Sequence, residues 1–241
     1  SMNKLYCFSI LFLLSLSAFG QKQFVVDANA SMRQVDGSFS KIKISGPLKV
    51  YLSQANDESI AISASEEKFK IIIKTIVKNN TLHIYLEGDN KLWRKNINPK
   101  VYVSFKQLTN LEISGASSVM NVGSIKGNEL SVDISGACKL AANIDVQELH
   151  FEISGASKAI ISGNTNILLL DCSGASDFSS FDLQANNAQI DVSGASDVNI
   201  NVSKSIHANA SGASRLYYKG NPSETEFKDS GASNISAQNR K

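Results

Sequence analysis

Acidic side chains recur at one position of a repeated motif, and they are the residues of this chain best suited to chemistry. Each lies two residues before a Ser-Gly-Ala corner, as in Asp171-Cys172-Ser173. If equivalent positions stack, one carboxylate follows the next at the spacing of neighbouring β-strands, about 4.8 Å. The predicted column consists of Glu112, Asp133, Glu152, Asp171 and Asp191, and Asn209 and Lys228 continue it.

Like charges at this spacing repel one another, so the column predicts a bound partner or a counter-charge. A glycan or an envelope protein is the partner that such a long face would suit, and Ca²⁺, which prefers oxygen ligands, is a weaker hypothesis. The alternative, which we favour, is a solvated stripe partly balanced by Lys139, Lys158 and Arg215. Because no Asp-x-Asp-x-Asp-Gly spacing occurs, we predict no metal site and no cofactor.

The same carboxylates raise the alternative of a polysaccharide lyase or hydrolase. Such enzymes need a second acid or base in a different environment, whereas this column is regular and not convergent. His150 and His207 share an outward position but lie on different repeats, and no His-Glu-x-x-His or Gly-x-Ser-x-Gly motif occurs. We therefore predict no catalytic residue and keep the polysaccharide-active enzyme as the alternative function.

Two further features have both a binding and a structural interpretation. Trp93 lies beside Lys91, Arg94 and Lys95, and an aromatic ring next to cations can stack on sugars, although a loop tryptophan often only packs locally. The serines of the corners could present hydroxyls to a ligand, but we favour hydrogen bonds to the corner backbone. Trp93 joins the acidic column as a predicted ligand-binding residue.

A repeat of about 19 residues must position these side chains. Ser-Gly-Ala-Ser or Ser-Gly-Ala-Cys begins at seven sites separated by 21, 19, 19, 20, 18 and 19 residues. The residues before each corner alternate apolar and polar, as in Leu149 to Ile153, which indicates a half-buried strand. A single repeat cannot bury its apolar face, but stacked repeats can. Residues 107–241 are therefore predicted to form a β-solenoid of about seven rungs.

Glycine is predicted to shape every corner, because it adopts backbone angles that a side chain would disfavour. The corner glycines are Gly115, Gly136, Gly155, Gly174, Gly194, Gly212 and Gly231. The register also separates Cys138 from Cys172 by two rungs, roughly 10 Å, whereas a disulfide needs Cα atoms within about 7 Å. We expect two free thiols, with Cys172 in the core.

Residues 21–106 are β-rich but lack the 19-residue period, and they predict an N-terminal β-sheet cap over the open end of the solenoid. They carry 14 basic and 8 acidic residues, net +6, against 9 and 14, net −5, in residues 107–241. A degenerate copy of the corner, Ile44 to Val50, is expected to lie outside the array.

Residues 1–20 are typical of a secretory signal, with Lys4, an apolar core over 5–16 and small residues before Gln21. The core is shorter than the roughly 20 residues that span a bilayer, so a retained anchor is the minor alternative and no transmembrane segment is expected in the mature chain. Without Lys4 the net charge is 23 − 22 = +1, which argues against nucleic acid as a partner.

Five segments together resemble a known family. They are Gly37 to Ile42, Ile44 to Leu52, Asn80 to Ile84, the Ser-Gly series, and Leu216 to Pro222. In this order, over nearly all of residues 32–237, they resemble the putative auto-transporter adhesin, head GIN domain family. The resemblance implies a right-handed parallel β-helix of the pectate-lyase-like class, in an exported envelope protein of Bacteroidetes-type bacteria. It supplies no catalytic residues. The expected function is binding or structural and adhesin-like, in the periplasm, at the cell surface or secreted.

Overall fold

The structure is a computed structural model that describes residues 11–12, 25–88 and 96–238. The chain is all-β, with a parallel β-solenoid of about seven turns. Trp93, and the predicted signal over residues 1–20 apart from Leu11–Phe12, lie outside the described residues. No helix in the described part is long and apolar enough to cross a membrane.

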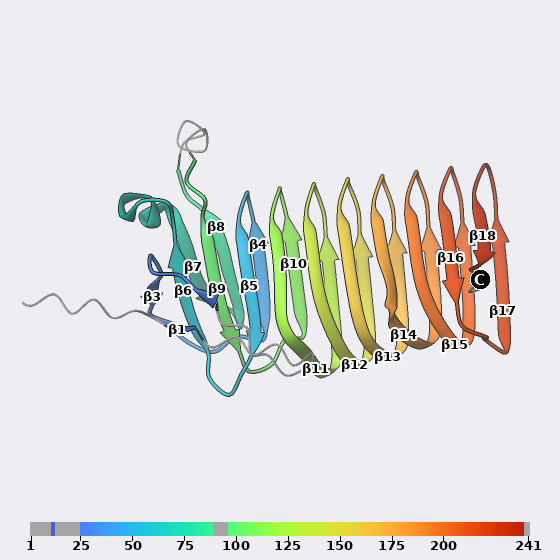
Figure 1. The fold of residues 1–241 in the computed structure, drawn as a ribbon, viewed down its shortest axis with the longest axis horizontal. Coiled ribbons are helices and arrows are strands. Elements are labelled where there is room, and N and C mark those ends of the chain that lie inside the picture. Colours follow the sequence, from blue (N-terminus) through green and yellow to red (C-terminus); the bar gives the residue numbers. More distant parts are fainter. Residues whose placement is uncertain (1–10, 13–24, 89–95, 239–241) are drawn as a thin grey trace, which may run out of the picture.

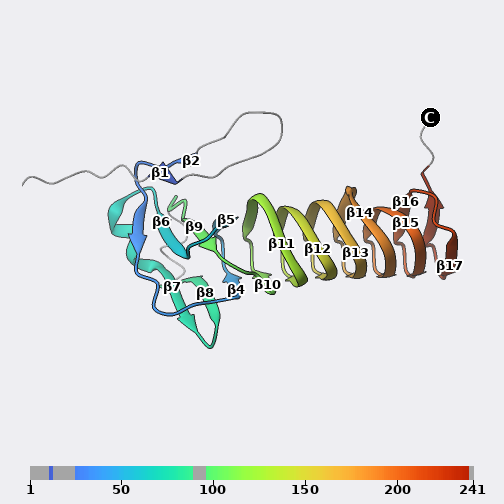
Figure 2. The ribbon, with the colours of Figure 1, turned by 90° about the horizontal axis from the view of Figure 1, so that it is seen from below.

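The solenoid is built from long strands that each run from one corner, around a bend, to the next corner (Figures 1 and 2). Five of them contain 14 to 17 residues and pair in parallel with their neighbours. They are β11 (Ser118–Ile134), β12 (Lys139–Ile153), β13 (Lys158–Cys172), β14 (Asp177–Val192) and β15 (Asp197–Ala210). The predicted register is confirmed, since Leu130, Leu149 and Leu168 are successive partners.

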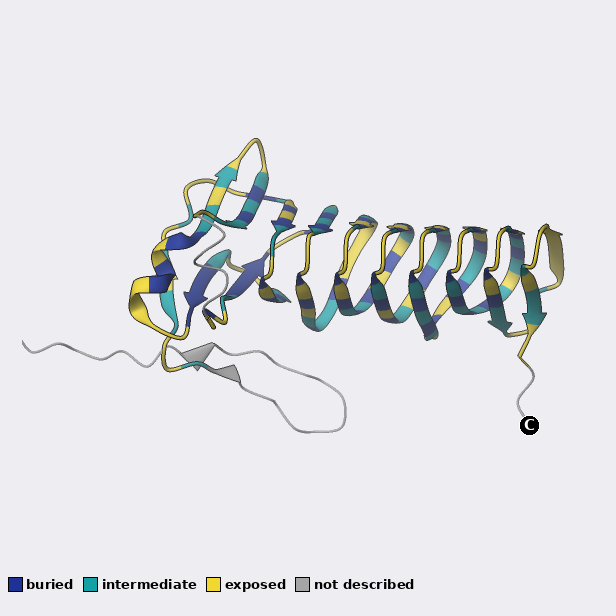
Figure 3. Ribbon diagram, turned by 90° about the horizontal axis from the view of Figure 1, so that it is seen from above, coloured by how far each residue is buried: buried dark blue, intermediate teal, exposed yellow. Residues whose placement is uncertain are grey.

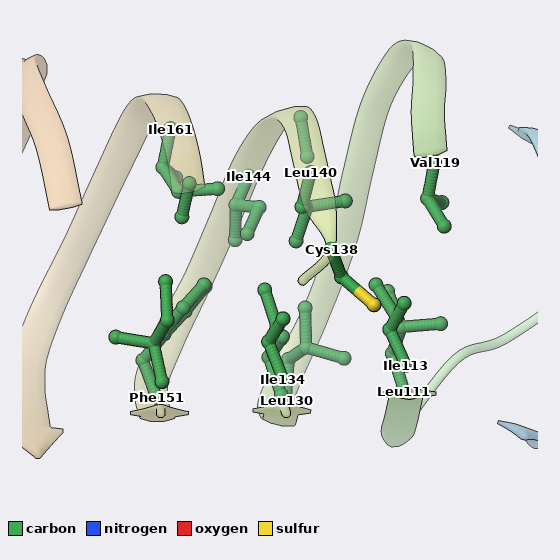
Figure 4. Packing of buried hydrophobic residues seen from close by; sticks show 14 of the residues in the cluster. Leu111, Ile113, Val119, Leu130, Ile134, Cys138, Leu140, Ile144, Phe151 and Ile161 are labelled. Carbon is green, nitrogen blue, oxygen red and sulfur yellow. The ribbon is translucent and has the colours of Figure 1, made fainter. Parts of the chain in front are cut away.

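Inward residues of successive rungs merge into one core, because the alternating pattern puts apolar side chains on one face of every strand. Figure 4 shows this packing around Leu130, Ile134 and Phe151. Phe151 is 1% exposed and meets Phe178 edge to face, with ring centroids 4.9 Å apart. The core is continuous along the solenoid, so each rung depends on its neighbours.

The Ser-Gly-Ala corners lie above one another along one edge of the solenoid (Figure 1). Gly155 has a φ of +76°, and the next N–H, of Ala156, donates to the Gly136 oxygen at 2.8 Å. Ser157 is 2% exposed and its hydroxyl also donates to the Gly136 oxygen, at 3.2 Å. The corner serines of this type therefore satisfy backbone groups, as we favoured.

The stack begins earlier in the chain than the 19-residue period indicates. β4 (Lys41–Ser45) pairs with β10 (Asn110–Ser114), and β5 (Lys49–Gln54) pairs with β11, so the expectation that Ile44 to Val50 lies outside the array is wrong. β8 (Thr81–Leu86) and β9 (Lys100–Phe105) stack in parallel beneath β4 and β5. The 19-residue spacing did not reveal this rung, because an excursion of the chain separates the strand partners Ser45 and Ser114 by 69 residues.

That excursion caps the N-terminal end of the stack (Figure 2). β6 (Ser59–Ser63) and β7 (Ile73–Lys78) pair antiparallel with β9 and β8, and the 3₁₀ helix η1 (Glu67–Ile72) connects them. β3 (Ser31–Arg33) pairs antiparallel with β6, and β2 (Val25–Val26) pairs with β1 (Leu11–Phe12). The cap replaces a bare strand edge by antiparallel partners.

The C-terminal end of the solenoid is protected against the addition of another strand in a different way. Its short strands are β16 (Arg215–Lys219), β17 (Glu224–Asp229) and β18 (Asn234–Ala237), and all six residues of β17 are exposed (Figure 3). Asp229 continues the inward column of Ile153, Cys172, Val192 and Ala210. A charge that points inward at a sheet edge opposes the addition of another strand.

We therefore expect Asp229→Ile to promote self-association, because it extends the apolar column to the open edge. Size-exclusion chromatography with light scattering should show a mass that increases with protein concentration, beyond that of the wild type. Glu226→Ile, which places the same side chain on the outer side of β17, is the matched control. Equal association of both variants would contradict a role for the inward charge.

Cys138 and Cys172 are free and buried, which confirms the prediction for the described residues. Burial raises the pKa of the Cys172 thiol to about 12, and it also raises the pKa of Cys138. Because only the thiolate reacts, we expect both thiols to resist an aromatic disulfide reagent at pH 8 in a Cys7→Ser chain, and to react together after unfolding. Rapid reaction of the folded protein would contradict the buried placement.

Candidate ligand-binding face

The five predicted carboxylates form one outward column across β10 to β14. Each is the strand partner of the next, from Glu112 with Asp133 through Asp171 with Asp191. They project outward because the residues on either side of each one are buried core residues, such as Leu170 and Cys172 around Asp171. The predicted column is therefore a real geometric feature, and its role in binding stays a prediction.

The column has partners at its two ends. Lys43 of β4 lies beneath Glu112, and its Nζ is 2.6 Å from the Glu112 carboxylate. This contact holds the pKa of Lys43 above its ordinary value. At the other end, the Asn209 amide donates to Asp191 at 2.7 Å. Lys43 was not predicted as a member of the column, because its strand was expected to lie outside the array.

The middle of the column differs from its two ends. Asp133, Glu152 and Asp171 have no ion pair among the described residues. Two of the expected counter-charges lie on the strands that follow the corners. There Lys158 forms an ion pair with Asp177 at 2.5 Å, and Arg215 forms one with Asp197 at 2.6 Å. The expectation that these two cations balance the column is therefore wrong, because the corner turns them onto the other face.

Shallow hollows lie beside the carboxylates. One of about 230 Å³ has His150, Glu152, Asp171 and Gln189 in its lining. A second, of about 250 Å³, lies between Asp171, Asp191 and the corner serines and ends at Lys228. Both are open and follow the rungs, so the face offers repeated contacts along a line and not one deep pocket.

Two outward histidines each lie beside at least one glutamate. His150 and His207 share an outward column, as expected, with Leu169 and Gln189 between them. His150 Nε2 lies 2.8 Å from Glu148, and His207 lies 3.5 Å from each of two glutamates of β17. Within the described residues, no group of three histidine, cysteine or acidic side chains is placed to hold a metal ion.

These observations define a structural class. The described residues form a capped parallel β-solenoid that carries equivalent outer side chains on successive rungs. The chain belongs to the putative auto-transporter adhesin, head GIN domain family, whose model matches residues 38–222. The resemblance inferred from the five sequence segments is thereby confirmed.

Solved structures share the fold. A putative adhesin from Bacteroides fragilis is 20% identical, with 87% of this chain and 96% of that chain covered and a TM-score of 0.79. A putative adhesin from Parabacteroides distasonis is 15% identical, with 86% and 97% covered and a TM-score of 0.69. A putative lipid binding protein from the same species is 18% identical, with 88% and 97% covered and a TM-score of 0.66. No curated protein matches.

Proposed function

We propose that this chain is an exported, adhesin-like protein of a bacterial cell envelope that binds a glycan or a protein through the outer columns of its solenoid, without catalysis. The observation that carries the proposal is the middle of the acidic column, where Asp133, Glu152 and Asp171 form no ion pair within the described residues, on a scaffold that repeats one contact per rung. The family and the adhesin-like structural neighbours support the same role.

Export and origin belong to this proposal. Residues 1–20 have the layout of a secretory signal, and similar crystal structures include proteins of Bacteroides fragilis and Parabacteroides merdae. We infer a Bacteroidetes-type source and a location in the periplasm, at the cell surface or outside the cell. Cell fractionation of a tagged full-length chain tests this, and retention in the cytoplasm would contradict it.

Neutralising the acidic column should weaken ligand binding and at the same time raise the stability of the fold. We expect Asp133→Asn, Glu152→Gln and Asp171→Asn together to weaken binding to immobilised envelope fractions several-fold, because three aligned contacts are lost. The same variant should melt a few degrees higher at low salt, since like charges on neighbouring strands repel one another, and added salt should reduce this gain. Biolayer interferometry and calorimetric melting give the two readings.

The matched control removes three exposed carboxylates elsewhere, in Asp36→Asn, Asp57→Asn and Asp182→Asn. Envelope binding that falls equally in both variants would show a general charge effect and contradict the proposal. Turnover of any polysaccharide in a panel that is lost in Asp133→Ala with Asp171→Ala would replace it with the enzymatic alternative. A melting temperature that depends on Ca²⁺ and reverts with chelator would instead assign the column to a cation.

A further inference from the structure

A third hollow lies on the bend of the solenoid, away from the acidic column. It measures about 340 Å³ and crosses three rungs, β12, β13 and β14. Among the residues that the structure describes, its lining is dominated by amides, with one carboxylate and without lysine or arginine. The polar side chains around it include Asp145, Gln147, Asn164, Asn166, Gln184 and Asn186.

Part of this lining is held in place by the protein. The Asn186 amide donates to Asn166 Oδ1 at 3.0 Å, and Ser203 donates to Asn186 Oδ1 at 2.9 Å. Thr165, 3% exposed, forms the floor and donates to the Ile167 oxygen at 2.9 Å. This ladder fixes amide groups at the bend before any ligand arrives, which reduces the entropy lost on binding.

The remaining polar groups are exposed and available. Asn164 is the strand partner of Asp145 on one side and of Gln184 on the other, so the three project in one outward line. All three are exposed, and no side-chain hydrogen bond or ion pair within the described residues engages them. Asp145 offers acceptor oxygens, and each of the two amides offers both a donor and an acceptor, at one side chain per rung of about 4.8 Å.

This chemistry suits sugar hydroxyls better than other ligands. Without a cation in its lining, the hollow gives no charge to phosphate or to nucleic acid. A peptide strand would need a free sheet edge, but here the backbone of β13 is already paired with β12 and β14. Hydroxyls both donate and accept, as amides do, and the rung spacing is close to the length of one sugar unit in an extended chain.

We propose that this amide-lined hollow binds a neutral polysaccharide chain laid along the solenoid axis, with successive sugars meeting Asp145, Asn164 and Gln184. The proposal rests on the adhesin-like function and gives it a ligand class and a site separate from the acidic column. The hollow has no aromatic platform in its lining, so each contact is weak and the chain of sugars gains affinity by repetition.

Affinity electrophoresis of the full chain in native gels that contain dextran, mannan or a soluble β-glucan tests the proposal, with anionic alginate as the comparison. We expect at least one neutral polysaccharide to retard the protein more than alginate does. Asn164→Ala with Gln184→Ala should bind it about tenfold more weakly, because two neutral hydrogen-bonding groups are lost. Both side chains are exposed and without internal partners, so the variant should melt as the wild type does.

Asn199→Ala with Asn234→Ala removes two outward amides beyond the corner and should leave retardation unchanged. If the protein binds envelope fractions but no neutral polysaccharide retards it, the hollow proposal is overturned while the proposed function stands. If a peptide array is bound and that binding is lost in Asn164→Ala with Gln184→Ala, the ligand class is wrong. If envelope binding is absent, the proposed function fails, whereas retardation lost in the hollow variant would still support the site.

Discussion

Replacing Gly155 by alanine is expected to lower the free energy of unfolding by about 3 kcal/mol or more, because two effects add. The backbone φ of +76° disfavours any L side chain. An added Cβ would also lie 2.3 Å from the Gly136 oxygen and 2.9 Å from the Gly136 nitrogen, which are backbone atoms of the rung below. The rungs cannot separate at the corner without breaking the hydrogen bond between Ala156 and Gly136.

Gly37→Ala is the matched control, since it isolates the conformational effect. Gly37 also has a positive φ, +99°, but an added Cβ would meet only the Val77 side chain at 3.7 Å. We expect a loss of about 1–2 kcal/mol there. Denaturant unfolding followed by circular dichroism measures both. Equal losses in the two variants would mean that the corners do not stack as tightly as the structure has them.

The register of the solenoid was predictable from sequence for a physical reason. Each rung carries one corner that only a small set of residues can form, and strands of fixed side-chain alternation lead into it. The corner therefore aligns the repeats at the same residue of each one. This alignment correctly predicted that Asp171 lies above Glu152 and Cys172 above Ile153. A one-residue error would have turned each apolar side chain outward, so the pattern tolerates only one alignment.

Two parts of the molecule were not predictable in this way. The rung of β4 and β5 was missed because an inserted cap breaks the spacing, although Gly46 keeps the positive φ of the other corners. The amide-lined hollow was missed because the pairing shifts at the bend, as between Ala185 and Asn187. Rungs there differ in length, so counting residues from the corner does not show which side chains become neighbours.

The distribution of charge follows from the same geometry. Lys158 lies four residues after Ser154, close in sequence to the column residue Glu152, and was therefore predicted to be a counter-charge. The corner between them places it on another face, where it pairs with Asp177 on the adjacent rung. Neighbours on the same face are therefore about 19 residues apart, and electrostatic partners must be sought between rungs.

The inward column that contains Phe151 gives the second large prediction. We expect Phe151→Ala to lower the free energy of unfolding by about 3–5 kcal/mol, because it leaves a cavity in the middle of the core. Phe151 is 1% exposed and packs edge to face on Phe178, which follows the next corner along the stack. The loss is felt by the rungs on both sides, since in a repeat stack the interfaces between neighbours carry much of the stability.

Phe227 occupies the same column on β17 and provides the control. It is 37% exposed and touches Tyr218, with no further rung above it among the described residues. Phe227→Ala should therefore lower the free energy of unfolding by no more than about 1 kcal/mol. Amide hydrogen exchange would show which strands lose protection in each variant. We expect only β17 and β18 to lose it in Phe227→Ala, but strands on both sides of β12 to lose it in Phe151→Ala. If the central substitution also affected only its own rung, the solenoid would be a row of independent turns, and a continuous binding face held rigid by one core would have no structural basis.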